Sequence, residues 1–165
     1  MQSHLFFICP TDQIEFFINR KFRADNFFYT SLGNSVSFDE EFIRYLKRII
    51  LKKKIQRVTF VLTEDNAIVL GAMKTKNSSS LNRMKSFYLT VEIEQDISHH
   101  LWRRCDARIV VLCKLLNRKI EELKASLATM DLDFLEIDGK IYSNQRRSFR
   151  NIASIPFNRE LYHLN

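Results

Sequence analysis

Residues 5–12, LFFICPTD, decide the fold that we expect. The first five form an unbroken apolar run, which is typical of a β-strand buried on both faces. A proline ends this strand, and Thr11 or Asp12 can then cap a helix, with Glu15 at capping-box distance from Asp12. Apolar residues recur at helical spacing over residues 14–22. The stretch therefore predicts a buried strand followed directly by a helix.

The same alternation continues further along the chain. Residues 27–30 (FFYT) predict a second strand, and residues 31–35 (SLGNS) predict a turn. Ser37 and Glu40 have the spacing of another capping box. An apolar stripe over residues 42–50 then predicts a second helix.

A third strand is predicted at residues 58–62, followed by a polar turn at residues 63–66. Alternating strands and helices with short connections imply a parallel sheet with right-handed crossovers. Ligands of such sheets bind outside the carboxyl ends of the strands. The turns after the three strands are therefore expected to form one crevice, although ordinary turns and helix caps have the same composition. The candidate crevice residues are Cys9, Thr11, Asp12, Ser31, Gly33, Asn34, Thr63, Asp65 and Asn66.

The second half of the chain has a different pattern. Residues 80–130 are expected to be mostly helical, with a break near residues 96–98. Residues 134–142 read as a strand, a tight Asp-Gly turn and a second strand. We expect an α/β fold, a three-layer α/β/α arrangement around a mainly parallel sheet. Residues 1–143 would form one domain, and residues 144–165 a C-terminal arm that packs on the domain or on a partner subunit.

Composition limits the class of protein. A chain of 165 residues suits one domain, and 45% hydrophobic residues exclude disorder as the main state. No targeting segment is visible, and no apolar window approaches the roughly 20 residues that span a bilayer, so no membrane is expected as a partner. The three cysteines, Cys9, Cys105 and Cys113, are widely spaced, which favours a reducing compartment. We expect a cytoplasmic protein.

The chain carries a formal net charge of +7, and its basic residues cluster at two places. Residues 52–54 are three lysines where a helix should end, and cations there favour the helix dipole. Arg146, Arg147 and Arg150 lie in the expected arm and are more open to a partner.

The three turns, in their order, resemble those of the β-class carbonic anhydrases. In that family Cys-x-Asp-x-Arg follows the first strand, a Gly-Asn turn the second, and Gly-His-x-x-Cys-Gly the third. The corresponding stretches here are residues 9–12, residues 33–34 and residues 62–67. Residues 135–142 are similar to the family's last strand and turn. The resemblance covers most of residues 5–142 and implies the family's fold and a homodimer.

The departures from the family's motifs concern its zinc site. The resemblance places the family's first zinc-binding cysteine at Cys9, its histidine at Thr63 and its second cysteine at Asn66. Threonine and asparagine are poor zinc ligands. Asp12 stands one residue too far along for the family's aspartate, and the arginine of its Asp-Arg pair is absent. The resemblance therefore implies a scaffold that has lost its catalytic metal, and we expect no cofactor.

Other constellations give weak support to an enzyme. His99, His100 and Cys105 are three residues of metal-binding type, but adjacent histidines on a helix point about 100° apart, so we favour a polar helix face beside Trp102. No Gly-rich phosphate loop, nucleophile elbow or His-Glu-x-x-His helix is present. Cys9 is either a reactive thiol at a helix start or a small buried side chain, and we favour the second.

Three functions stay open. We favour a non-catalytic protein that binds a small ligand or a protein partner in the crevice, where Asn34, Thr63 and Asn66 would hydrogen-bond each other, a water or a ligand. A nucleic-acid-binding protein with a basic surface is the second, and an enzyme with zinc-independent chemistry at Cys9 and Asp12 is the third. Apolar residues of the arm need a place to bury, which favours the homodimer. They are Phe149, Ile152, Ile155, Phe157 and Leu161.

Overall fold

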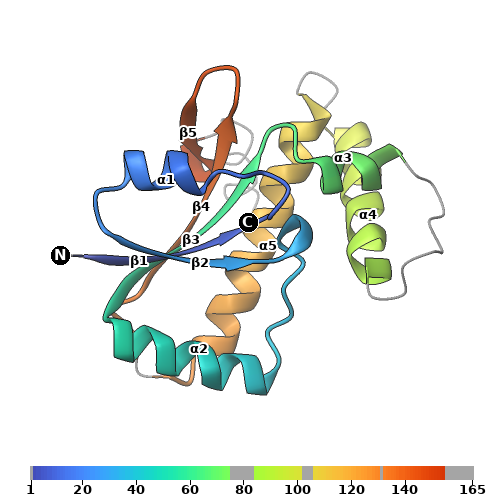
Figure 1. The fold of residues 1–165 in the computed structure, drawn as a ribbon. Coiled ribbons are helices and arrows are strands. Elements are labelled where there is room, and N and C mark those ends of the chain that lie inside the picture. The colour runs from blue at the N-terminus through green and yellow to red at the C-terminus, as the bar shows by residue number, and fades with distance from the viewer. Residues whose placement is uncertain (1, 75–83, 102–105, 131, 155–165) are drawn as a thin grey trace.

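Five strands form one sheet in the order β2-β1-β3-β4-β5 (Figure 1). The computed structural model describes residues 2–74, 84–101, 106–130 and 132–154. Strands β1 to β4 are parallel to one another, and β5 is antiparallel to β4. This arrangement confirms the predicted α/β class with a mainly parallel sheet. The strands are β1 (Ser3–Ile8), β2 (Asp25–Thr30), β3 (Ile55–Thr63), β4 (Glu136–Ser143) and β5 (Ser148–Asn151).

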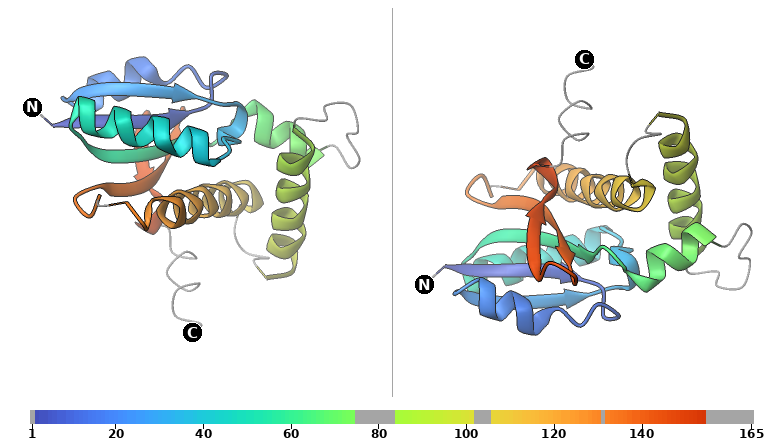
Figure 2. Two further views of the ribbon diagram at one scale, coloured as in Figure 1. Left: turned by 90° about the horizontal axis from the view of Figure 1, so that it is seen from below. Right: turned by 90° about the horizontal axis from the view of Figure 1, so that it is seen from above.

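The two faces of the sheet are covered by different helices. Helix α1 (Glu15–Lys21) packs on one face, where Ile18 joins Phe6 of β1 in an apolar cluster. Helices α2 (Glu40–Lys53) and α5 (Ala107–Leu127) pack on the other face, as Figures 1 and 2 show. The chain therefore forms the three layers expected for an α/β/α protein.

Strand β1 lies inside the sheet, and every one of its residues is buried. Successive side chains of a strand point to opposite faces, so Phe6 and Phe7 enter different layers. Phe7 stacks on Phe60 with ring centroids 4.7 Å apart, whereas Phe6 contacts Phe22 at 5.4 Å. The unbroken apolar run at residues 5–9 is explained by this burial on both faces.

Two further helices lie beyond the carboxyl ends of the strands (Figure 2). They are α3 (Ala67–Lys74) and α4 (Lys85–Leu101). The sequence did not predict α3, and the break expected near residues 96–98 is wrong because α4 runs through it without glycine or proline. The next helix, α5, begins only at Ala107, after an Asp106 cap that accepts a hydrogen bond from the Arg108 amide. Among the described residues, no helix has the length and apolar character needed to cross a membrane.

Both predicted capping boxes are wrong. Helix α1 begins after Ile14, which provides no side-chain cap, and the Asp12 carboxylate is bonded elsewhere. The cap of α2 is Asp39, whose carboxylate accepts a hydrogen bond from the Phe42 amide at 2.8 Å. In each case the two residues have the spacing of a capping box, but the helix begins two residues later than a cap at the first of them would require.

The expected hairpin at residues 134–142 is also wrong, because Asp138 and Gly139 lie inside the single strand β4. They pair with Thr59 and Phe60 of β3. Gly139 is needed here for packing, since a Cβ atom at this position would lie 2.7 Å from the Cδ1 atom of Ile152.

The chain reverses its direction after β4, and β5 then pairs with β4 in antiparallel orientation. The first part of the segment that we expected to form an arm is thus a strand of this sheet. Phe149 packs against Tyr142, and Ile152 is buried in the main core. Residues 155–165, with the other three apolar residues of the arm, lie outside the described residues.

Candidate functional site

The turns that follow β1, β2 and β3 meet at the carboxyl edge of the sheet, since these strands are parallel neighbours. The structure joins six of the nine predicted crevice residues into two hydrogen-bonded groups. One is centred on the Asp12 carboxylate, and the other on the Cys9 sulfur.

Asp12 accepts three hydrogen bonds from the turn after β3. The Thr63 amide donates to Oδ2 at 2.9 Å, the Thr63 hydroxyl to Oδ1 at 2.8 Å, and the Asn66 Nδ2 amide to Oδ1 at 2.7 Å. Thr63 and Asn66 are 2% and 1% exposed. Burial raises the pKa of Asp12 and outweighs these hydrogen bonds, which lower it. We call Asp12, Thr63 and Asn66 the Asp12 cluster.

The local backbone holds both ends of the Asp12 cluster. The Asp12 amide donates to the Cys9 carbonyl at 3.0 Å, which closes the turn after β1. The Asn66 Oδ1 atom accepts a hydrogen bond from the Val69 amide at 2.9 Å, at the start of α3. Asn66 thus bonds both a helix terminus and a carboxylate, so its side chain has little freedom to turn toward another ligand.

Cys9 is fully buried and lies in the second group. Its Sγ atom accepts a hydrogen bond from the Gly33 amide at 3.1 Å and lies 3.0 Å from the Thr11 hydroxyl. Gly33 has φ +57°, and a Cβ atom there would lie 2.6 Å from Cζ of Phe87. The sulfur is therefore enclosed by the turn after β2, as a small buried side chain would be.

The expected hydrogen bonds among Asn34, Thr63 and Asn66 are not formed. Asp12 takes the latter two, while the Asn34 Nδ2 amide donates to the Val61 carbonyl at 2.9 Å. The Oδ1 atom of Asn34 is buried and has no hydrogen-bond partner among the described residues.

Two other candidate residues form no hydrogen bond with the Asp12 cluster among the described residues. The hydroxyl of Ser31 is buried and, within the described part of the chain, has no hydrogen-bond partner. Asp65 turns outward and accepts hydrogen bonds from Nδ2 of Asn144.

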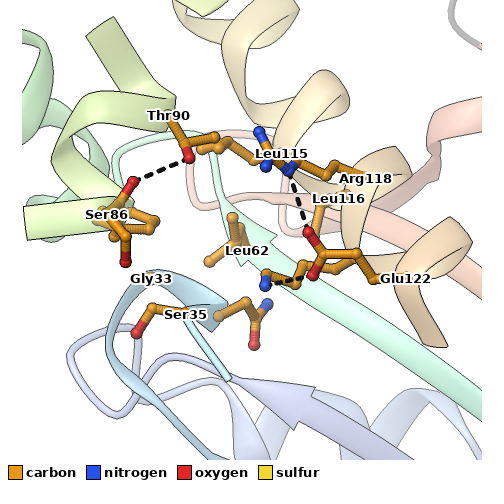
Figure 3. A pocket seen from close by; sticks show the side chains of 12 residues that line it. Gly33, Ser35, Leu62, Ser86, Thr90, Leu115, Leu116, Arg118 and Glu122 are labelled. Carbon is orange, nitrogen blue, oxygen red and sulfur yellow. Dashed lines mark hydrogen bonds and ion pairs between the residues drawn. The ribbon is translucent and has the colours of Figure 1, made fainter. Parts of the chain in front are cut away.

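A cavity of about 150 Å³ lies beside this edge of the sheet, between the turn after β2 and helices α4 and α5 (Figure 3). Gly33, Asn34 and Leu62 line it from the sheet side. The helix residues that line the cavity could not be predicted from the sequence, because nothing in the local pattern places α4 and α5 over this edge. They are Ser86, Phe87, Thr90, Leu115, Leu116, Arg118, Lys119 and Glu122.

The charged residues of the cavity form a small network on α5, shown in Figure 3. Glu122 accepts hydrogen bonds from Arg118 Nε at 3.0 Å and from Lys119 Nζ at 2.6 Å. Lys119 also donates to the Val36 carbonyl at 2.9 Å. The terminal N–H groups of Arg118 have no hydrogen-bond partner in the described part of the chain, so they are available to a ligand.

The chemistry of the Asp12 cluster bears on the zinc site that the resemblance implies. Thr63 and Asn66 use neutral donors toward Asp12, whereas zinc requires thiolate, imidazole or carboxylate ligands. Within the described residues, no three side chains of histidine, cysteine, aspartate or glutamate gather in a way that could hold a metal. The side chains of His99, His100 and Cys105 lie outside the described residues.

The protein thus has a mainly parallel α/β fold with a hydrogen-bonded cluster at the ends of its strands. Comparison with solved structures identifies this fold. Wild-type CafD, a β-carbonic anhydrase of Aspergillus fumigatus, matches at a TM-score of 0.70 and 14% identity, over 92% of this chain and 89% of that chain. CafA of the same fungus matches at a TM-score of 0.67 and 15% identity, over 97% of this chain and 80% of that chain. One of two tetrameric β-carbonic anhydrases from Sordaria macrospora matches at a TM-score of 0.68 and 13% identity, over 91% of this chain and 80% of that chain.

No protein-family model and no curated protein matches the sequence. The chain therefore has the fold of the β-carbonic anhydrases, which confirms the resemblance seen in its turns. At these identities the likeness concerns the fold alone.

Proposed function

We propose that this protein is a non-catalytic β-carbonic-anhydrase-like protein whose strand-end region binds a small ligand. The observation that carries the first half of the proposal is the Asp12 cluster. Two of the three positions that the resemblance assigns to zinc ligands are Thr63 and Asn66, and both donate hydrogen bonds to Asp12. Without a bound metal, a water of pKa near 7 is not formed, and CO2 hydration has no nucleophile.

The purified protein is expected to carry no stoichiometric zinc and to hydrate CO2 no faster than background. One thiol at Cys9 does not hold the ion alone, because zinc sites use at least three protein ligands. The test is elemental analysis and a CO2 hydration assay after expression in zinc-supplemented medium, with CafD as the positive control. About one zinc per chain, lost on Cys9→Ser, would return the protein to the metalloenzymes.

The cavity beside Asn34 supports the second half of the proposal. Its apolar wall is formed by Leu62, Leu115 and Leu116, and the terminal N–H groups of Arg118 are unused by the described residues. A ligand that fits both features has a small apolar body and an anionic end. A small carboxylic acid has this chemistry.

Filling the cavity is expected to abolish this binding. Native mass spectrometry of the gently purified protein should show a small bound mass that is absent from Leu115→Phe, since the larger ring occupies the space of the ligand. The matched control is Leu51→Phe on α2, where the side chain is 53% exposed and does not line the cavity. Equal bound mass in both variants would contradict the cavity as the site.

We also propose that the protein is a homodimer. Helix α4 carries an apolar pair four residues apart, Leu89 and Ile93, which are 49% and 55% exposed. Light scattering at micromolar concentration is expected to give twice the mass of one chain, and a single-chain mass for Leu89→Glu with Ile93→Glu. A single-chain mass for the wild-type protein would contradict the dimer.

A further inference from the structure

Helix α1 and the hairpin of β4 and β5 lie on the opposite side of the sheet from α2 (Figure 1). A second groove lies between α1 and this hairpin. Its volume is about 430 Å³. The residues that line it come from α1 and from the two strands and the turn of the hairpin. They are Phe17, Arg20, Lys21, Tyr142, Arg147, Ser148 and Phe149.

The charged side chains that line this groove are all cationic among the described residues. They are Arg20, Lys21 and Arg147. All three cations are exposed, and none forms an ion pair with another described residue. Most lysines and arginines of α5, by contrast, pair with glutamates one turn away. Three unpaired cations around one hollow favour an anionic ligand with several charges.

Aromatic rings form the floor of the same groove. Phe17 stacks on Tyr142 with ring centroids 5.2 Å apart, and Tyr142 lies 4.7 Å from Phe149. Phe16, which precedes Phe17 in α1, meets the Phe17 ring edge to face and is 67% exposed. Phe16 thus presents an exposed aromatic ring next to the floor of the groove.

We propose that this groove binds single-stranded nucleic acid, with phosphates on Arg20, Lys21 and Arg147 and a base stacked on Phe16. Proteins that bind single strands combine a basic track with aromatic rings, on which bases stack whatever their identity. A duplex hides the faces of its bases, so the rings favour a single strand. The net charge of +7 adds long-range attraction for such a strand. This inference is independent of the cavity beside Asn34, which lies on the other face.

The binding is tested by fluorescence anisotropy with a labelled oligouridylate of about 12 nucleotides. Three phosphate contacts predict a slope of about −2 in a plot of log affinity against log salt. Raising the salt from about 50 mM to about 200 mM should therefore weaken binding roughly 20-fold. A matching duplex should bind more weakly than the single strand.

Two variants locate the site. Arg20→Gln with Lys21→Gln and Arg147→Gln should weaken binding at least about tenfold and remove most of the salt slope. Phe16→Ala should weaken it at least about fivefold with the slope unchanged, because a stacked base is lost but no phosphate contact. The matched control, Arg44→Gln with Arg48→Gln and Lys52→Gln, removes the same charge from exposed positions of α2.

Four outcomes would overturn the proposal. They are no binding at low salt, equal weakening by the two triple variants, equal or tighter binding of the duplex, and a wild-type affinity for Phe16→Ala. Circular dichroism of each variant checks that it folds. If the three-residue variant is unfolded, Lys21→Gln alone is used, with Lys52→Gln as its control.

Discussion

Replacing Asp12 with alanine is expected to lower the free energy of unfolding by about 3–5 kcal/mol. The change removes three hydrogen bonds to a carboxylate and leaves the Thr63 amide, the Thr63 hydroxyl and the Asn66 Nδ2 amide without their acceptor. Thr63 and Asn66 are almost fully buried, so water cannot readily replace the carboxylate. Urea unfolding followed by circular dichroism measures the difference.

The matched control for this prediction is Asp133→Ala, at an exposed aspartate just before β4. Its free energy of unfolding should stay within about 0.5 kcal/mol of the wild-type value. A loss for Asp12→Ala no larger than that of the control would mean that the Asp12 cluster does not stabilise the sheet edge.

The same aspartate predicts a pH dependence. Burial raises the pKa of Asp12 in the folded state, so the folded state holds this proton more tightly than the unfolded chain does. The contribution of Asp12 is therefore fully present below the ordinary aspartate pKa and is lost as the pH rises through the raised value. Because Asp12→Asn cannot titrate, the wild-type unfolding free energy minus that of this variant should fall with pH across the acid range. A rise over that range would contradict the direction of the pKa shift.

Thr63→His combined with Asn66→Cys is expected to change the zinc content from none to about one ion per chain. The resemblance places these residues at the family's histidine and second cysteine, and Cys9 would supply the third ligand. The double variant loses two hydrogen bonds to Asp12, so its metal-free form should be less stable than the wild-type protein. Zinc binds only the folded form, which should raise the melting temperature in zinc above that in chelator.

The control for the zinc variant is Thr63→Ala with Asn66→Ala. It loses the same two side-chain hydrogen bonds but gains no ligand, so it should bind no zinc and show no stabilisation by the metal. Elemental analysis and thermal unfolding check both proteins. If the histidine and cysteine variant also retains no zinc, then Cys9, Thr63 and Asn66 do not converge on one ion.

Local patterns were sufficient to predict the first three strands and the two helices between them. The apolar run at residues 5–9 predicted a strand buried on both faces, and β1 has helices on either side of it. The short connections predicted parallel pairing, which the register of β1 with its two neighbours confirms. These features follow from side-chain periodicity, which acts over a few residues.

The residue types at the zinc-ligand positions were also readable from the sequence, since Thr63 and Asn66 carry no thiol or imidazole. The hydrogen bonds of these two residues could not be predicted, because Thr63 lies 51 positions and Asn66 54 positions from Asp12 in the sequence. Asp12 looked like a helix cap in its local context, and the same side chain instead bonds the turn after β3. Whether a carboxylate caps its own helix or bonds a distant turn depends on which donors the packed sheet brings within reach.

The cavity beside Asn34 and the basic groove between α1 and the β4–β5 hairpin likewise depend on packing between segments that are distant in the sequence. Gly139 looked like a turn because Asp-Gly pairs favour turns, but pairing with β3 and contact with Ile152 place it inside β4. That placement moves the reversal of the chain to residues 144–147 and brings β5 beside α1, where the basic groove forms. The sequence alone thus determined the elements and the residue types available at each turn. The contacts between elements decided which of those residues share a site, since hydrogen bonds and burial across the sheet outweigh the weaker preferences of local turns and caps.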